Sequence, residues 1–198
     1  MNVFDTLIKQ SKDPEGFIGK AMIHIMNIAH KERTRWALNK LEIGKDSIVL
    51  DVGCGGGNTI KIISKVATEG KVCGIDYSKE SVETTRKKNN KAVEKGLVEV
   101  VRASVSNIPY SEETFHVVTA VQTHFYWPDL KNDIKEVYRI VKKNGIFMIS
   151  SELYKIKYHM KHYKTNEEHK GLFKEAGFDN IRIFEDKGWL CIVGTKPM

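Results

Sequence analysis

The sequence lacks any long hydrophobic run, and no stretch approaches the about 20 consecutive apolar residues that a membrane-spanning helix needs. Residues 1–5 also lack the basic region followed by an apolar one that marks a secretory signal. We therefore expect a cytoplasmic protein that is not inserted in a membrane.

Cysteine and proline are both scarce. The three cysteines, Cys54, Cys73 and Cys191, show no C-x-x-C spacing, so neither a disulfide framework nor a zinc site is indicated. Only four prolines, beside 41% hydrophobic and 29% charged residues, exclude a disordered or fibrous chain. A length of 198 residues suits a single globular domain.

Charge of one sign is not concentrated in a tail, although the net charge is +7. We interpret the scattered lysines as a solvated basic surface rather than a nucleic-acid site. The most basic stretch, residues 154–170, holds five lysines, three histidines, three tyrosines and two glutamates, and is either a solvated face or an attractant for an acidic substrate. His159 and His162 have no carboxylate or cysteine partner at a fixed spacing, so no metal site is expected.

Short apolar runs alternate with helical patterns from Ser47 onward, which indicates a parallel sheet covered by helices. Strands are expected at 48–52, 72–76, 98–102, 115–121 and 146–150. Helices are expected at 59–67, 79–95, 129–142 and 165–176, with 103–114 mostly loop. The last strands, 180–185 and 190–195, are joined too closely for a parallel crossover, so they form an antiparallel hairpin.

Several residues mark the ends of these helices. Ser78 is suited to cap the helix that follows it, and residues 165–168 have capping-box spacing. Gly177 ends the helix that begins near Thr165, and residues 143–145 close the preceding helix before strand five.

The N-terminal part carries an amphipathic pattern, in which Ile18, Met22, Ile25, Met26 and Ala29 recur at helical spacing. We expect residues 1–45 to form a helical cap or lid on a core of residues 46–198 within one domain. Just past the stripe, Asn27 and His30 either contact a ligand from this lid or form a helix junction.

A glycine-rich loop, residues 51–57, follows the first strand, where backbone N–H groups can approach a ligand closely. Asp76 ends the second strand, and its carboxylate can accept hydrogen bonds from both hydroxyls of a ribose. Together these features predict an adenosine-type ligand. A Walker loop is excluded because no Gly-Lys-Ser/Thr follows, and the glycine spacing does not match the G-x-G-x-x-G of dinucleotide dehydrogenases.

An ordered series of motifs resembles the class I S-adenosylmethionine-dependent methyltransferases, especially the branch typified by ubiquinone and menaquinone biosynthesis enzymes. The motifs are residues 49–57, 74–78, 108–110, 115–118, 136–145 and 175–178. The resemblance covers about residues 46–198 and implies a Rossmann-like three-layer α/β sandwich, with a mostly parallel seven-stranded sheet. It also implies S-adenosyl-L-methionine as cofactor and S-adenosyl-L-homocysteine as product.

The resemblance assigns Asp51, Gly53 and Gly55 to the methionine end of the cofactor, Asp76 to the ribose and Tyr77 to the adenine. The other cofactor-binding candidates are Cys54, Gly57, Ser78, Ser104, Val105 and Gln122. The sequence departs from the family at Ala103-Ser104, where Gly-Asp is common, and at His116, where aspartate is common.

The segment after the fourth strand, residues 122–127, supplies the acceptor-side candidates. His124 would act as a general base if the acceptor is a hydroxyl or amine, but it is otherwise a wall residue. The further substrate-binding candidates are Tyr126, Trp127, Glu152 and Tyr154. The aromatic side chains are equally compatible with core packing under a loop, and Glu152 and Tyr154 with an exposed loop.

These features favour methyl transfer to a small molecule. Transfer to RNA is one alternative, and a non-catalytic cofactor-binding module that acts through a partner is another. The sequence does not name the methylated atom or the oligomeric state.

Overall fold

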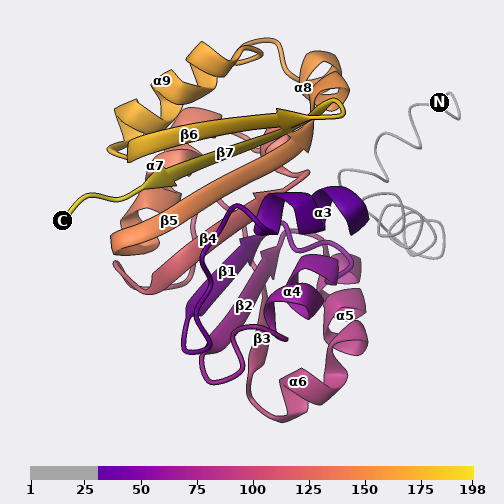
Figure 1. Ribbon diagram of the computed structural model, residues 1–198. Helices are drawn as coiled ribbons and strands as arrows, with labels where there is room; N and C mark the ends of the chain where they lie inside the picture. Colours follow the sequence, from indigo (N-terminus) through magenta and orange to yellow (C-terminus); the bar gives the residue numbers. More distant parts are fainter. Residues whose placement is uncertain (1–30) are drawn as a thin grey trace, which may run out of the picture.

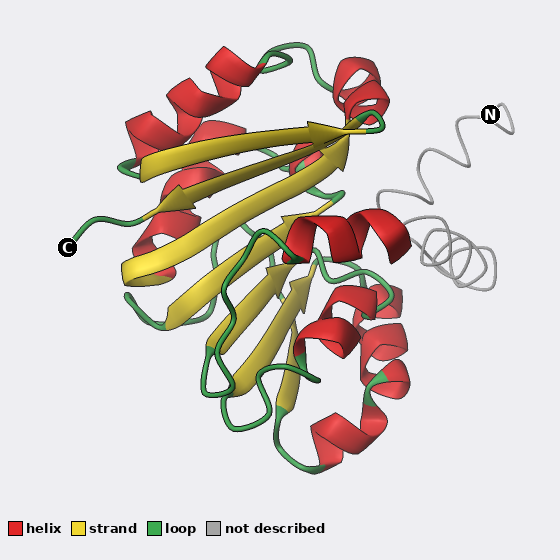
Figure 2. Ribbon diagram, in the orientation of Figure 1, coloured by secondary structure: helices red, strands yellow, loops and turns green. Residues whose placement is uncertain are grey.

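The computed structural model describes residues 31–198. The predicted N-terminal stripe, with Asn27 and His30, lies outside the described residues. A seven-stranded sheet forms the middle layer, and helices cover both of its faces (Figures 1 and 2). The strand order is β3-β2-β1-β4-β5-β7-β6.

The strands are β1 (Ile48–Val52), β2 (Lys71–Asp76), β3 (Val98–Arg102), β4 (Phe115–Val121), β5 (Val141–Glu152), β6 (Asp179–Asp186) and β7 (Trp189–Thr195). The helices are α3 (Lys31–Leu38), α4 (Asn58–Ile63), α5 (Lys79–Lys88), α6 (Asn90–Glu94), the 3₁₀ turn η1 (His124–Tyr126), α7 (Leu130–Ile140), α8 (Leu153–His159) and α9 (Asn166–Ala176). No helix among these residues is long and apolar enough to cross a bilayer.

Strands β1 to β5 run parallel, and β7 lies antiparallel between β5 and β6. The predicted fold class, with its C-terminal hairpin, is therefore confirmed. Lys187 and Gly188 form the hairpin turn with φ values of 50° and 76°, the positive values that match the twist of the paired strands.

The hydrophobic core has two parts, one on each face of the sheet, because alternate strand residues point to opposite faces. On one face Leu50 and Phe147 pack with residues of α7 and α9 such as Phe173. On the other face Val49 and Met148 pack with residues of α3 and α4. Both layers hold the carboxyl ends of β1, β2 and β4 at a common edge.

The predicted caps are confirmed. The Ser78 hydroxyl accepts from the Ser81 N–H at the start of α5. Thr165 and Glu168 form the reciprocal capping box of α9, and Gly177 ends that helix with φ of 108°. Glycine suits this position because residues with a Cβ rarely adopt a left-handed conformation.

The predicted helix over residues 79–95 is interrupted at Asn89, which separates α5 from α6. The Asn89 side chain donates to the carbonyls of Gly57 and Thr85, so it ties the end of α5 to the glycine loop instead of continuing the helix. The predicted helix over 59–67 is also shorter, since α4 ends at Ile63 and turns follow it.

The prediction for residues 143–145 was wrong. Strand β5 begins at Val141, directly after α7, and these residues bulge out of it instead of preceding it. Phe115 pairs with Val141 whereas Val117 pairs with Ile146, so the extra residues are accommodated on β5. Asn144 adopts φ of 61° within the bulge.

Candidate functional site

The glycine loop joins β1 to α4 at the carboxyl edge of the sheet (Figure 1). The N–H groups of Gly53 and Cys54 both donate to the Ile75 carbonyl, at 2.8 and 3.0 Å. Because Ile75 lies at the end of β2, these bonds fix the loop beside the residue that follows, Asp76. The sheet thus brings the two predicted halves of the cofactor site together.

The three glycines of the loop have φ values of 71° at Gly53, 52° at Gly55 and 71° at Gly57. A Cβ at Gly53 would lie 2.3 Å from Thr123 Oγ1, and one at Gly57 would lie 2.7 Å from Asn89 Nδ2. A Cβ at Gly55 would meet no atom nearer than the Gly53 carbonyl oxygen, at 3.9 Å, apart from its neighbours in the chain. Gly53 and Gly57 therefore serve close packing, whereas Gly55 leaves room for a ligand to approach the backbone.

The Asp76 carboxylate forms hydrogen bonds with the glycine loop and with the residue before α5. One oxygen accepts from the Gly55 N–H at 2.8 Å and the other from the Ser78 N–H at 2.9 Å. A carboxylate oxygen can accept more than one hydrogen bond, so ribose hydroxyls could bind Asp76 in addition to these N–H groups. This geometry fits the predicted ribose role.

Asp51 is 1% exposed, and Thr119 Oγ1 donates to it at 2.7 Å. Burial raises the pKa of Asp51 to about 7, against the effect of the Thr119 hydrogen bond, and nearby Asp76 raises it further. A cation bound here would favour the ionised carboxylate. The ammonium and sulfonium groups of S-adenosylmethionine are such cations, so the residues fit the predicted cofactor.

The adenine-side candidates lie beyond Asp76. Tyr77 is 64% exposed, and the guanidinium of Arg102 lies 5.7 Å from its ring centroid. Val105 is buried and Ser104 half-buried. The thiol of Cys54 is buried within the loop, and burial raises its pKa well above the usual value, which makes it an unreactive wall residue.

Gln122 follows β4 directly and adopts φ of 62°, which is rare outside glycine. It is 7% exposed, and its side-chain N–H donates to Glu152 at 2.7 Å. Its side-chain oxygen has no partner in the described part of the chain. The neighbouring Thr123 lies against Gly53, so the end of β4 adjoins the glycine loop.

The environment of His124 differs from that of Gln122. It is 1% exposed, its Nδ1 lies 3.0 Å from Ser151 Oγ, and its ring centroid lies 5.6 Å from that of His169 on α9. Burial, and secondarily His169, lowers the pKa of His124 well below its usual value. The imidazole is therefore neutral and weakly basic.

Two of the aromatic candidates pack against the core. The Trp127 ring stacks on Phe147 at 6.3 Å, and its N–H donates to Thr123 Oγ1 at 3.1 Å. The Tyr126 ring packs on Phe125 at 4.5 Å. The packing interpretation of these aromatic side chains thus has direct support.

Glu152 and Tyr154 are not loop residues. Glu152 ends β5 and forms ion pairs with Arg33, at 3.3 Å, and Lys155, at 3.6 Å. Tyr154 lies on α8, 63% exposed. The basic stretch begins with this helix, which the sequence did not reveal because it is only seven residues long.

Arg33 and Thr119 are site residues that sequence reasoning missed, whereas Thr123 lies within the predicted acceptor-side segment 122–127. Thr119 alone left a signal, as a polar residue inside an apolar strand. No cluster of three His, Cys, Asp or Glu that could hold a metal occurs in residues 31–198.

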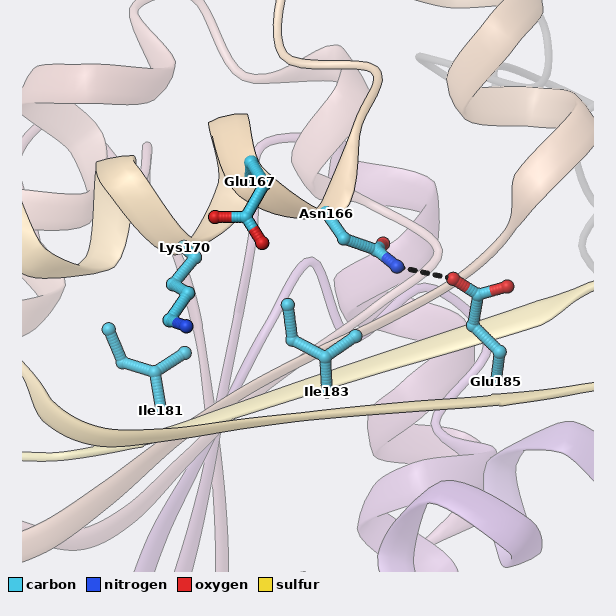
Figure 3. Close-up of a pocket in the computed structure, with 6 residues that line it drawn as sticks. All are labelled: Asn166, Glu167, Lys170, Ile181, Ile183 and Glu185. Atoms are coloured by element: carbon cyan, nitrogen blue, oxygen red, sulfur yellow. Dashed lines mark hydrogen bonds between the residues drawn. The ribbon is translucent and has the colours of Figure 1, made fainter.

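A pocket lies between α9 and β6, outside the site described above (Figure 3). Ile181 and Ile183 form its floor, and a hydrogen bond between Asn166 and Glu185 closes one end. Strand β6 is the outer edge of the sheet, several strands from β1 and its glycine loop. None of the predicted site residues lines this pocket.

Comparison with known proteins gives a consistent result. Residues 50–149 match the model of a family described as "Methyltransferase domain". The Bacillus subtilis protein YrhH, which is assigned to the methyltransferases, is 27% identical over 162 residues, which are 80% of this chain and 83% of that protein.

A demethylmenaquinone methyltransferase of Bacillus mycoides is 32% identical over 117 residues, which are 59% of this chain and 49% of that enzyme. The match thus spans about half the length of that enzyme. The crystal structure of a SAM-dependent methyltransferase from Aquifex aeolicus superposes with a TM-score of 0.73 at 23% identity. The superposition covers 89% of this chain and 97% of the other, and shows that the fold is shared.

Proposed function

Since this chain belongs to the methyltransferase domain family and is an S-adenosylmethionine-dependent enzyme, we propose that it transfers a methyl group to a small-molecule acceptor. The acceptor binds at the carboxyl ends of β4 and β5, beside the glycine loop. Demethylmenaquinone methyltransferases among the relatives support a small molecule, since their names identify one as their substrate.

The proposal rests mainly on the burial of Asp51 and the raised pKa of its carboxyl. This carboxyl is buried in β1, at the start of the glycine loop, and its pKa is raised to about 7. A buried carboxyl in this state is stabilised by a cationic ligand and gains nothing from a phosphate. It therefore favours a cationic methyl donor over a dinucleotide.

The remaining roles follow the edge of the sheet. Asp51, Gly53 and Gly55 hold the methionine end, and Asp76 accepts the ribose hydroxyls. Tyr77, Ser104 and Val105 flank the adenine, and Gln122 lies at the methyl end. The other three candidates have structural roles. The buried Cys54 and the closely packed Gly57 shape the loop, and the Ser78 side chain caps α5.

S-Adenosylmethionine supplies a methyl group that its positively charged sulfur has already activated. The protein must then align the acceptor and exclude water, which alone lowers the barrier substantially. We assign His124, Tyr126 and Trp127 to the wall of the acceptor site and Tyr154 to its exposed rim. General-base catalysis by His124 is the alternative role, and its lowered pKa makes the imidazole a weak base.

RNA is the second candidate acceptor, and one surface favours it. Tyr154 and Tyr158 are 63% and 62% exposed on α8, one helical turn apart, with Lys157 exposed between them. Exposed aromatic rings among lysines can stack on unpaired bases. The segment is short, and no further aromatic platform adjoins it among the exposed residues of the described chain.

Incubation with methyl-labelled S-adenosylmethionine and a cell extract tests the proposal. After separation of RNA, protein and metabolites, we expect label in the metabolite fraction. Asp76→Ala protein serves as control, because its weakened donor binding should remove the label that depends on this enzyme. Label in RNA or protein would contradict the proposed acceptor class.

A further inference from the structure

Gln122 and Glu152 face each other across two neighbouring strands. Gln122 follows β4, Glu152 ends β5, and the Gln122 backbone N–H donates to the Ser150 carbonyl at 2.8 Å. Their side chains are joined by a hydrogen bond of 2.7 Å from Gln122 Nε2 to Glu152 Oε2. The bond links the residue beside the glycine loop to the start of α8.

The backbone of Gln122 is strained. A φ of 62° places a residue with a long side chain in the left-handed region, which costs free energy unless the surrounding structure holds it there. The residue is also only 7% exposed, so the fold maintains an unfavourable conformation for a polar residue. Such strain is typical of residues whose position serves a function.

The chemistry of the pair fixes the orientation of the Gln122 amide. An ionised carboxylate can only accept hydrogen bonds, so the amide must turn its NH₂ group toward Glu152. Arg33 and Lys155, which can only donate, pair with the same carboxylate. The Gln122 oxygen, Oε1, then points away from Glu152 and is buried without a partner in the described residues.

The oxygen is the negative end of the amide dipole, and it belongs to the residue next to Thr123, which lies against Gly53. We propose that Glu152 is a positioning residue, which holds the Gln122 amide so that its oxygen faces the positively charged sulfur of the methyl donor. The inference rests on the proposed function and revises the sequence prediction that Glu152 binds the acceptor. Glu152 acts through Gln122 and does not touch the reacting atoms.

The inference predicts a change in ligand preference, which a general structural defect would not produce. S-Adenosylhomocysteine has the same shape as the donor without the methyl group and the positive charge. Gln122 Nε2, Arg33 and Lys155 all contact the same oxygen, Glu152 Oε2, so the test variant must remove this acceptor. In Glu152→Met no oxygen holds the Gln122 NH₂ group, and the Gln122 amide oxygen is no longer kept toward the positive sulfur.

Calorimetric titration of the full chain with each compound measures the effect. We expect Glu152→Met to weaken S-adenosylmethionine binding about tenfold and S-adenosylhomocysteine binding less than about twofold. Gln122→Met, which removes the oxygen, should show the same selective loss. Glu152→Asp keeps a group that only accepts and should retain the preference of the original protein.

Glu113→Met is the matched control, since Glu113 also pairs with a buried lysine, Lys196, at 3.4 Å but away from the loop. It should change neither affinity. An equal loss of both ligands in Glu152→Met, or no loss of either, would overturn the positioning role. Failure of the unaltered protein to bind either ligand would instead overturn the proposed function itself.

Discussion

Asp51 shows how one buried residue can specify a ligand. Its carboxyl is buried, it accepts a hydrogen bond from Thr119, and burial together with the charge of Asp76 raises its pKa to about 7. In the proposed complex, the positive charge of the methyl donor would stabilise the ionised form of this carboxyl.

This argument predicts a pH-dependent affinity. Below about pH 7 Asp51 is protonated in the free protein, and a bound cation lowers its pKa, so binding releases a proton. Affinity for S-adenosylmethionine should rise from pH 6 to pH 8, by at most about tenfold per unit below the pKa, and level off above it. Calorimetry at several pH values checks this rise.

Asp51→Asn is the control for that experiment. It should bind more weakly at high pH and show a flatter dependence, because the titrating group is gone. An unchanged slope in Asp51→Asn would assign the pH dependence to another group and contradict the role given to Asp51.

His124 predicts a pH effect on stability. Burial lowers the pKa of His124 well below its usual value, and that of His169 is lowered as well. Below about pH 6.5 these histidines therefore bind protons in the unfolded chain but not in the folded chain. The free energy of unfolding should decrease as the pH falls from there toward the pKa values of the folded state.

Urea unfolding at pH 7 and pH 5 measures this decrease. His124→Asn, which can still bond to Ser151, should reduce the decrease, whereas the exposed His162→Asn should not. An equal decrease in the original protein and in His124→Asn would show that His124 is not kept neutral by the fold.

Sequence reasoning identified those proposed cofactor residues that stand next to a recognisable strand. Asp51, the loop glycines and Asp76 stand beside strand ends that the apolar runs mark. Thr119 was missed because its contact with Asp51 joins residues 68 positions apart. Arg33 was missed because nothing in its neighbourhood indicates that it meets the end of β5.

At the scale of elements, strands β1, β3 and β4 coincide with their predicted bounds. The errors occur where tertiary contacts override local pattern. Asn89 ends α5 because its side chain bonds to the glycine loop. Strand β5 begins early because Val141 pairs with Phe115 ahead of the bulge. Such contacts leave no periodic trace in the sequence.

The capping box of α9 gives a prediction at this scale. Thr165→Ala should lower the free energy of unfolding by about 1 kcal/mol, because the Thr165 hydroxyl no longer accepts the Glu168 N–H. S-Adenosylmethionine affinity should stay unchanged, since α9 covers a face of the sheet away from the loop. Denaturant unfolding and calorimetry measure the two quantities.

The exposed Thr68→Ala is a suitable control for the Thr165 variant, because Thr68 caps no helix. It should leave the free energy of unfolding nearly unchanged. A loss in Thr165→Ala no larger than that in Thr68→Ala would contradict the stabilising role of the capping box.

For the whole molecule, the order of the strands explains why distant residues form one site. The glycine loop after β1, Asp76 at the end of β2 and Gln122 after β4 meet because these three strands are parallel neighbours that end at one edge. The alternation of apolar runs and helices predicted this arrangement. It did not predict the ion pairs that connect α3 and α8 to the same edge.

The central claim is that this edge holds S-adenosylmethionine, and calorimetric titration of the full chain with S-adenosylmethionine and, in parallel, NADH tests it most directly. We expect S-adenosylmethionine to bind and NADH not to bind. Asp76→Ala should weaken the binding by about 1–3 kcal/mol, because both the ribose contacts and the support of Gly55 are lost. Binding of NADH alone, or an unchanged affinity in Asp76→Ala, would contradict the account.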